Sequence, residues 1–215
     1  MGPMSANPTK LAFVALLTML LASTGVWADP VTSVMTRDAQ ANITPAKALM
    51  MLKEGNERFI SGNKTDYDNI TQVKQTANGQ FPFASVLSCL DSRIPPEVIF
   101  DRGIGDLFVA RVAGNFVNDD ILGSMEFACK VAGATLIVVL GHSACGAIKG
   151  ASDNVQLGNL TATLANLAPA VQAVAASGVT VSSTDASAVQ QVAETNVAMT
   201  IDAIRKRSPL LNEMI

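Results

Sequence analysis

Three short apolar runs follow one another through the middle of the chain. They cover residues 81–88, 106–112 and 135–140 and are rich in phenylalanine, valine, leucine and isoleucine. A short run without polar alternation is typical of a strand whose two faces are both covered, as in a parallel sheet. Residues 120–133 repeat apolar positions at helical spacing. Strands alternating with helices predict an α/β fold with a mainly parallel sheet flanked by helices.

A helix is also predicted before the first apolar run. Thr44-Pro45 supplies an N-cap and a proline at the first helical position, and Gly62 ends the helix. Its apolar stripe contains Leu49, Leu52, Phe59 and Ile60. The polar and turn-rich residues 63–79 predict a connecting loop.

The C-terminal part of the chain is predicted to be helical. Residues 160–176 are rich in alanine and leucine, and residues 182–185 offer N-caps for a long helix that ends near Arg207. Ser208-Pro209 ends that helix, because the residue before a proline disfavours the helical conformation.

The N-terminus has the pattern of a secretory signal peptide. Lys10 precedes an apolar run over residues 11–21, and the small residues Val26 and Ala28 fit a cleavage site after Ala28. The run is shorter than the roughly 20 apolar residues of a membrane span. We therefore expect residues 1–28 to be removed and the mature protein to be periplasmic or secreted, without a stable membrane anchor.

Composition limits the remaining possibilities. A chain of 215 residues with 49% hydrophobic and 15% charged residues predicts one domain with a substantial core. We divide residues 29–215 into an N-terminal arm (29–62), an α/β core (80–150) and C-terminal helices (158–215). The net charge is −3 and the chain has no basic stripe, so electrostatics give no support for nucleic-acid binding. A small-molecule substrate is therefore favoured. Three cysteines are too few for a disulfide scaffold.

Candidate chemistry lies directly after two of the predicted strands. Cys89 follows the first apolar run, and His142 and Cys145 follow the third; His142 is the only histidine of the chain. Open α/β sheets bind ligands at the carboxyl ends of their strands. Two cysteines and one histidine form a ligand set typical of catalytic zinc, which keeps its fourth position open. Cys129, on a predicted helix without a partner motif, is interpreted as a packed thiol.

Asp91 and Arg93 lie next to Cys89 in the sequence Cys-Leu-Asp-Ser-Arg. A carboxylate beside a guanidinium keeps a low pKa and a fixed orientation. Asp91 could accept a hydrogen bond from water on the metal, or replace that water as a fourth ligand. The spacing between Cys89 and Arg93 is too short for a phosphatase or rhodanese loop.

Taken together, Cys-x-Asp-Ser-Arg, Arg-x-Ala-Gly-Asn (residues 111–115) and Gly-His-Ser-Ala-Cys-Gly (residues 141–146) resemble the β-class carbonic anhydrases. The resemblance implies one zinc ion per subunit, held by Cys89, His142 and Cys145. It also implies that Asp91 and Arg93 orient a zinc-bound hydroxide that attacks CO2 to give bicarbonate and a proton. The substrate-pocket residues that it implies are Gln80, Phe108 and Gly146.

The resemblance further implies a homodimer or a dimer of dimers, with the N-terminal helix embracing the second subunit. Three alternatives stay open: hydrolysis of another small heterocumulene such as COS or CS2, a non-catalytic zinc or thiol-binding module in which Cys89 and Cys145 pair, and a zinc site closed by Asp91. Members of the family usually continue past the region that corresponds to Leu210-Leu211 of this chain and form a further strand. This chain stops at Ile215, which leaves open a truncated sequence or a sheet without that strand.

Overall fold

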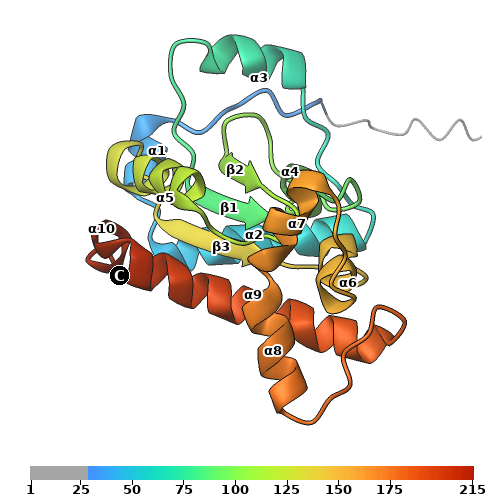
Figure 1. The fold of residues 1–215 in the computed structure, drawn as a ribbon. Helices are drawn as coiled ribbons and strands as arrows, with labels where there is room; N and C mark the ends of the chain where they lie inside the picture. Colours follow the sequence, from blue (N-terminus) through green and yellow to red (C-terminus); the bar gives the residue numbers. More distant parts are fainter. Residues whose placement is uncertain (1–28) are drawn as a thin grey trace, which may run out of the picture.

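The sheet has the predicted parallel arrangement. The computed structural model describes residues 29–215, so the predicted signal peptide lies outside the described residues. The strands are β1 (Ala84–Ser88), β2 (Leu107–Arg111) and β3 (Leu136–Leu140). All are parallel, in the order β2-β1-β3 (Figure 1). The α/β fold class is therefore confirmed.

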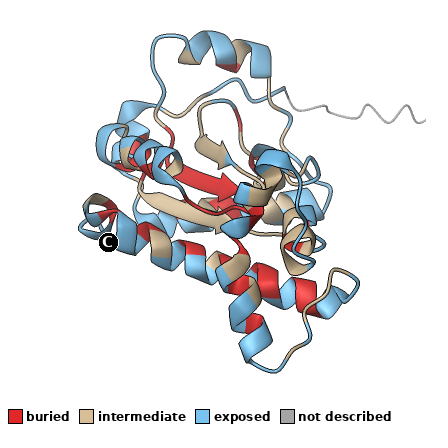
Figure 2. Cartoon of the chain, in the orientation of Figure 1, coloured by how far each residue is buried: buried red, intermediate tan, exposed pale blue. Residues whose placement is uncertain are grey.

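Helices cover both faces of this sheet. On one face, Ala84 in β1 packs with Ala48 and Leu52 of α2 (Pro45–Ile60). On the other face, Leu87 packs with residues of α5 (Asp119–Glu126), of the π-helical turn η1 (Phe127–Val131) and of α9 (Ala186–Arg207). Figure 2 shows that β1 is buried, whereas β2 and β3 on either side of it are only partly covered.

The remaining helices are short, and three of them gather beyond the carboxyl ends of the strands. These three are α6 (Gly146–Ser152), α7 (Gly158–Ala165) and α8 (Ala168–Ala176), which pack with α9 around the apolar cluster that contains Cys89 and Cys145 (Figure 1). The others are α1 (Arg37–Ala41), α3 (Asn69–Thr76), α4 (Pro96–Ile99) and α10 (Pro209–Asn212). None of the helices within residues 29–215 is both long and apolar enough to span a membrane.

The predicted helix caps are confirmed. The Thr44 side chain accepts a hydrogen bond from the Lys47 amide at the start of α2. The Asp185 carboxylate accepts from the amides of Ser187 and Ala188 at the start of α9. Gly62 has a φ of +75°, a conformation in which a Cβ atom would be strained. These residues therefore set both ends of α2 and the start of α9.

Three sequence predictions are corrected. Residues 63–79 contain the helix α3, and the helix predicted over residues 160–176 is two helices, α7 and α8. On α2 only Leu52 of the predicted stripe is buried, whereas Leu49, Phe59 and Ile60 are exposed. The contact line of α2 runs through the small residues Ala48 and Gly55, because a Cβ atom on Gly55 would collide with the Phe100 carbonyl oxygen.

Candidate metal centre

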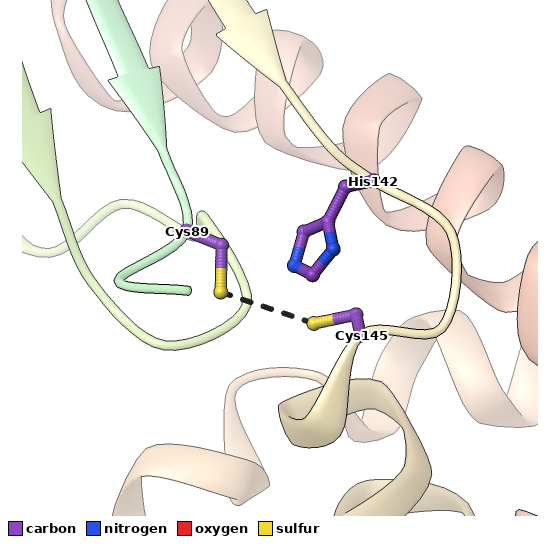
Figure 3. Close-up of side chains that lie close together, drawn as sticks. All are labelled: Cys89, His142 and Cys145. Atoms are coloured by element: carbon purple, nitrogen blue, oxygen red, sulfur yellow. Dashed lines mark hydrogen bonds between the residues drawn. The ribbon is translucent and has the colours of Figure 1, made fainter. Parts of the chain in front are cut away.

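Two strand ends and one helix start bring three ligand atoms together. Cys89 directly follows β1, His142 follows β3, and Cys145 is the residue before α6. One ligand atom from each lies within 4.8 Å of the others (Figure 3). Both cysteines are buried, with exposed fractions of 3% and 1%. The predicted convergence of these residues at the carboxyl edge of the sheet is thus present.

The hydrogen bonding of the two cysteine sulfur atoms favours the binding of a metal cation at this site. The two sulfur atoms are 3.9 Å apart. The hydrogen bond between them lowers the pKa of Cys89 and raises the pKa of the Cys145 thiol. The Gly114 amide also donates to Cys89 Sγ at 3.4 Å. A metal takes thiolates as ligands, so its binding would displace the proton that the two sulfurs share.

The His142 ring is oriented so that its Nε2 could bind a metal ion. Its Nδ1 lies 3.0 Å from the Ser143 carbonyl oxygen, which places the ring proton on Nδ1. Its Nε2 is buried and has no hydrogen-bond partner among the described residues. A buried nitrogen lone pair facing two sulfur atoms is costly unless it is satisfied. Zinc, which accepts both sulfur and nitrogen ligands, fits this donor set.

Asp91 and Arg93 form a bidentate ion pair beside these residues. Arg93 Nε donates to Asp91 Oδ1 at 2.8 Å, and Arg93 Nη2 donates to Asp91 Oδ2 at 2.7 Å. The hydrogen bonds from Arg93 hold the pKa of Asp91 far below its usual range. Asp91 Oδ2 is 3.9 Å from His142 Nε2. An ionised carboxylate therefore faces the metal centre while both of its oxygens are bound by Arg93.

The three predicted pocket residues lie in different places. Gly146 begins α6 directly after Cys145. Phe108 lies on β2 and packs edge-to-face against Phe127, with the ring centroids 6.2 Å apart. It packs against a different apolar cluster from the one that contains Cys89. Gln80 is exposed before β1. Of these three residues, a single chain thus brings only Gly146 next to the candidate metal ligands.

Cys129 is the packed thiol predicted from its helical position. It is 8% exposed in the cluster with Leu87 and Met125, and burial raises its pKa to about 11. Sequence reasoning gave no role to Arg111 and Gly114, although both contact the Cys89 loop. The Arg-x-Ala-Gly-Asn motif at the end of β2 was the signal that marked them.

The α/β fold and the set of two cysteines and one histidine define a candidate metal-binding protein, and comparison with known proteins identifies its family. The family model described as carbonic anhydrase matches residues 84–215, and the chain belongs to this family. Among its relatives, carbonic anhydrase 2 of Mycobacterium tuberculosis (strain H37Rv) is 43% identical over 120 residues. That alignment covers 55% of this chain and 58% of the relative. The carbonic anhydrase of Mycolicibacterium smegmatis is 43% identical over 109 residues, covering 50% of this chain and 53% of the relative.

A solved structure extends the likeness to the fold. A tetrameric β-carbonic anhydrase from Sordaria macrospora aligns with a TM-score of 0.60 and 26% identity. The alignment covers 77% of this chain and 84% of that one. The chain spans little more than half the length of the curated relatives named above.

Proposed function

We propose that this protein is a zinc-dependent enzyme that interconverts CO2 and bicarbonate. The observation that carries the proposal is the convergence of Cys89, His142 and Cys145 beside the ionised Asp91. Membership of the carbonic anhydrase family and the names of the mycobacterial relatives support the same activity.

Cys89 Sγ, His142 Nε2 and Cys145 Sγ would hold the ion. When bound, zinc supplies a Lewis acid that makes water a nucleophile near neutral pH. The structure supports an open fourth position, because both Asp91 oxygens are engaged by Arg93 and the carboxylate is not one of the three convergent ligands.

Asp91 is the residue that orients the attacking water. Its carboxylate remains ionised because Arg93 donates to it, so it can accept a hydrogen bond and fix the direction of a lone pair. Arg93 Nη2 also lies 3.4 Å from the Ala144 carbonyl oxygen, on the loop between His142 and Cys145. The ion pair therefore links the two ligand-bearing loops while it orients the nucleophile.

The pocket is proposed to be completed by a second copy of the chain. Gln80 and Phe108 lie outside the metal centre of their own chain, and in a homodimer or dimer of dimers they would line the partner's pocket. The similar β-carbonic anhydrase of Sordaria macrospora is tetrameric, which supports an assembly of this kind. We also propose that the enzyme works in the periplasm or is secreted, after cleavage near Ala28. Edman sequencing of the mature protein from a fractionated culture should begin near Asp29.

Metal content measured together with CO2 hydration tests the activity. The purified protein should contain one zinc ion per chain and should hydrate CO2 in stopped-flow assays. Cys89→Ser and His142→Ala should lose zinc and activity together, because each removes a ligand. Cys129→Ser is the matched control, since Cys129 is buried away from the centre, and it should keep both.

Other outcomes separate the alternatives. A zinc-loaded protein that hydrolyses COS or CS2 but does not hydrate CO2 would overturn the choice of substrate. Zinc-free protein with a Cys89–Cys145 disulfide would instead indicate a thiol module without turnover.

A further inference from the structure

Arg111 holds the loop that carries both a metal ligand and the orienting carboxylate. It is the last residue of β2 and lies opposite Ser88, the last residue of β1. Its Nε donates to the Cys89 carbonyl oxygen at 2.9 Å, and its Nη2 donates to the Asp91 carbonyl oxygen. A single planar guanidinium thus spans the backbone from Cys89 to Asp91, which a lysine ammonium could not do.

The loop between these two carbonyl groups is weakly held by packing. Leu90, at its centre, is 61% exposed. The Cys89 carbonyl oxygen also accepts from the Ser88 hydroxyl at 3.0 Å, and the Asp91 carbonyl oxygen accepts from the Ile94 amide at 3.2 Å. Each of those bonds anchors one end of the loop, whereas Arg111 fixes the distance between the ends.

Two arginines therefore divide the work at this centre. Arg93 binds the Asp91 carboxylate and reaches the loop of His142 and Cys145. Arg111 binds the backbone beneath Cys89 and Asp91. We propose that Arg111 is a positioning residue, which keeps Cys89 Sγ and the Asp91 carboxylate aligned with the other two ligands. This inference rests on the proposed zinc centre and names a residue on which its geometry depends.

Arg111 is not required by the apolar core. Arg111 is exposed, and its side chain donates hydrogen bonds to backbone oxygens at the edge of the sheet. Exposed polar contacts contribute little to global stability. The expected consequence of losing Arg111 is a folded protein with a misaligned loop. Groups that orient metal ligands typically change metal affinity about 10–100-fold when removed.

The experiment compares wild-type protein with Arg111→Lys and Arg111→Ala. Lysine keeps the charge but cannot bridge both carbonyl groups, and alanine removes both donors. Zinc affinity is measured by competition with a chromophoric chelator well below the unfolding temperature. Absorption of the Co²⁺-loaded proteins reports the geometry of the thiolate ligands. We expect about a tenfold or greater loss of zinc affinity in both variants, with altered thiolate-to-cobalt bands.

Arg207→Lys is the matched control. Arg207 also donates to a backbone oxygen, that of Val117 at 2.8 Å, and to the Asp119 carboxylate at 2.8 Å, at the opposite end of α9 from its N-cap. This variant should keep the wild-type zinc affinity and cobalt spectrum.

The outcomes distinguish the inference from the proposed function. Wild-type affinity and spectrum in Arg111→Lys would overturn the positioning role even if the enzyme is active. Wild-type protein that binds neither Zn²⁺ nor Co²⁺ would overturn the proposed centre itself. If Arg111→Ala does not fold, the conservative lysine variant decides the question.

Discussion

At the residue scale, the proposed role of the Asp91 carboxylate in orienting the attacking water makes its charge the first feature to test. Asp91→Asn keeps the shape of the side chain but removes its charge and gives one oxygen position to an amide donor. We expect bound zinc to stay near the wild-type level and the turnover number to fall by about a hundredfold, as when one preorganised polar group is removed from an active site. Stopped-flow kinetics and elemental analysis on the same sample check this prediction.

Asp153→Asn is a suitable control for that experiment. Asp153 is another carboxylate that accepts a hydrogen bond, from the Ser183 amide at 2.9 Å, but it lies at the end of α6 distant from Cys145. Its substitution should leave turnover unchanged. Full activity in Asp91→Asn would show that this carboxylate does not orient the nucleophile.

Asp101 is a second ionised carboxylate, and its effect is on stability. Its side chain is 1% exposed, accepts from Arg58 Nε at 2.6 Å and is bound by the amide and hydroxyl of Thr65. Burial raises the pKa of Asp101, but the hydrogen bonds from Arg58 and Thr65 outweigh it, so the pKa lies below its usual value. Its stabilising contribution is therefore present above about pH 4, the unfolded value, and is lost as the pH falls through the folded value.

Asp101→Asn isolates this charge, because asparagine also tolerates the positive φ of +46° at this position. The free energy of unfolding at pH 7 should fall by about 3 kcal/mol, since Arg58 loses a buried partner. Urea unfolding from pH 7 down to pH 3 should show a smaller loss of stability in the variant than in the wild type. Parallel curves for both proteins would contradict the assignment.

The convergence of the three candidate ligands could be predicted, because these residues combine metal-binding side chains with positions after predicted strands. Cys89, His142 and Cys145 each follow a recognisable strand, and parallel strands end at one edge of a sheet. The role of Arg111 could not be predicted in this way. Its function depends on the register that places it opposite Ser88, and the three apolar runs do not specify which strands are neighbours.

At the element scale, α3 shows why a polar segment can be misjudged as a loop. Its apolar residues Ile70 and Val73 are exposed, so it has no apolar stripe facing the core. Its packing depends on Gln72, which is 1% exposed, donates to the Ser33 carbonyl oxygen and accepts from the Ile104 amide. A pattern of apolar positions cannot detect a helix that is held by a buried amide.

Gln72→Ala tests this explanation. The variant leaves the Ile104 amide and the Ser33 carbonyl oxygen without this partner. The free energy of unfolding should therefore fall by about 1–3 kcal/mol. Gln75→Ala, on an exposed position of the same helix, should change stability by much less. Chemical denaturation of the two variants measures the difference, and equal effects would show that helix propensity, not Gln72, holds α3.

At the scale of the whole molecule, α2 presents apolar side chains that a single chain does not cover. Leu49 and Ile60 are 42% and 72% exposed, and their separation of three helical turns places them on the same side of α2. This exposure accounts for the failure of the predicted stripe as a core contact. It is consistent with the proposed homodimer or dimer of dimers, in which a second chain would cover these residues.

The assembly is therefore expected to depend on α2. Wild-type protein should have a mass in solution that is a multiple of two chains, and Leu49→Glu combined with Ile60→Glu should shift it towards the monomer, because two charges would be buried in the interface. Ile201→Glu is the control, since Ile201 is comparably exposed on α9 at 45%. Light scattering after gel filtration measures the masses.

A monomeric wild type would contradict the proposed assembly, whereas an unchanged mass in the double variant would place the interface elsewhere. If Gln80 and Phe108 complete the partner's pocket, the dissociated variant should keep its zinc but lose CO2 hydration.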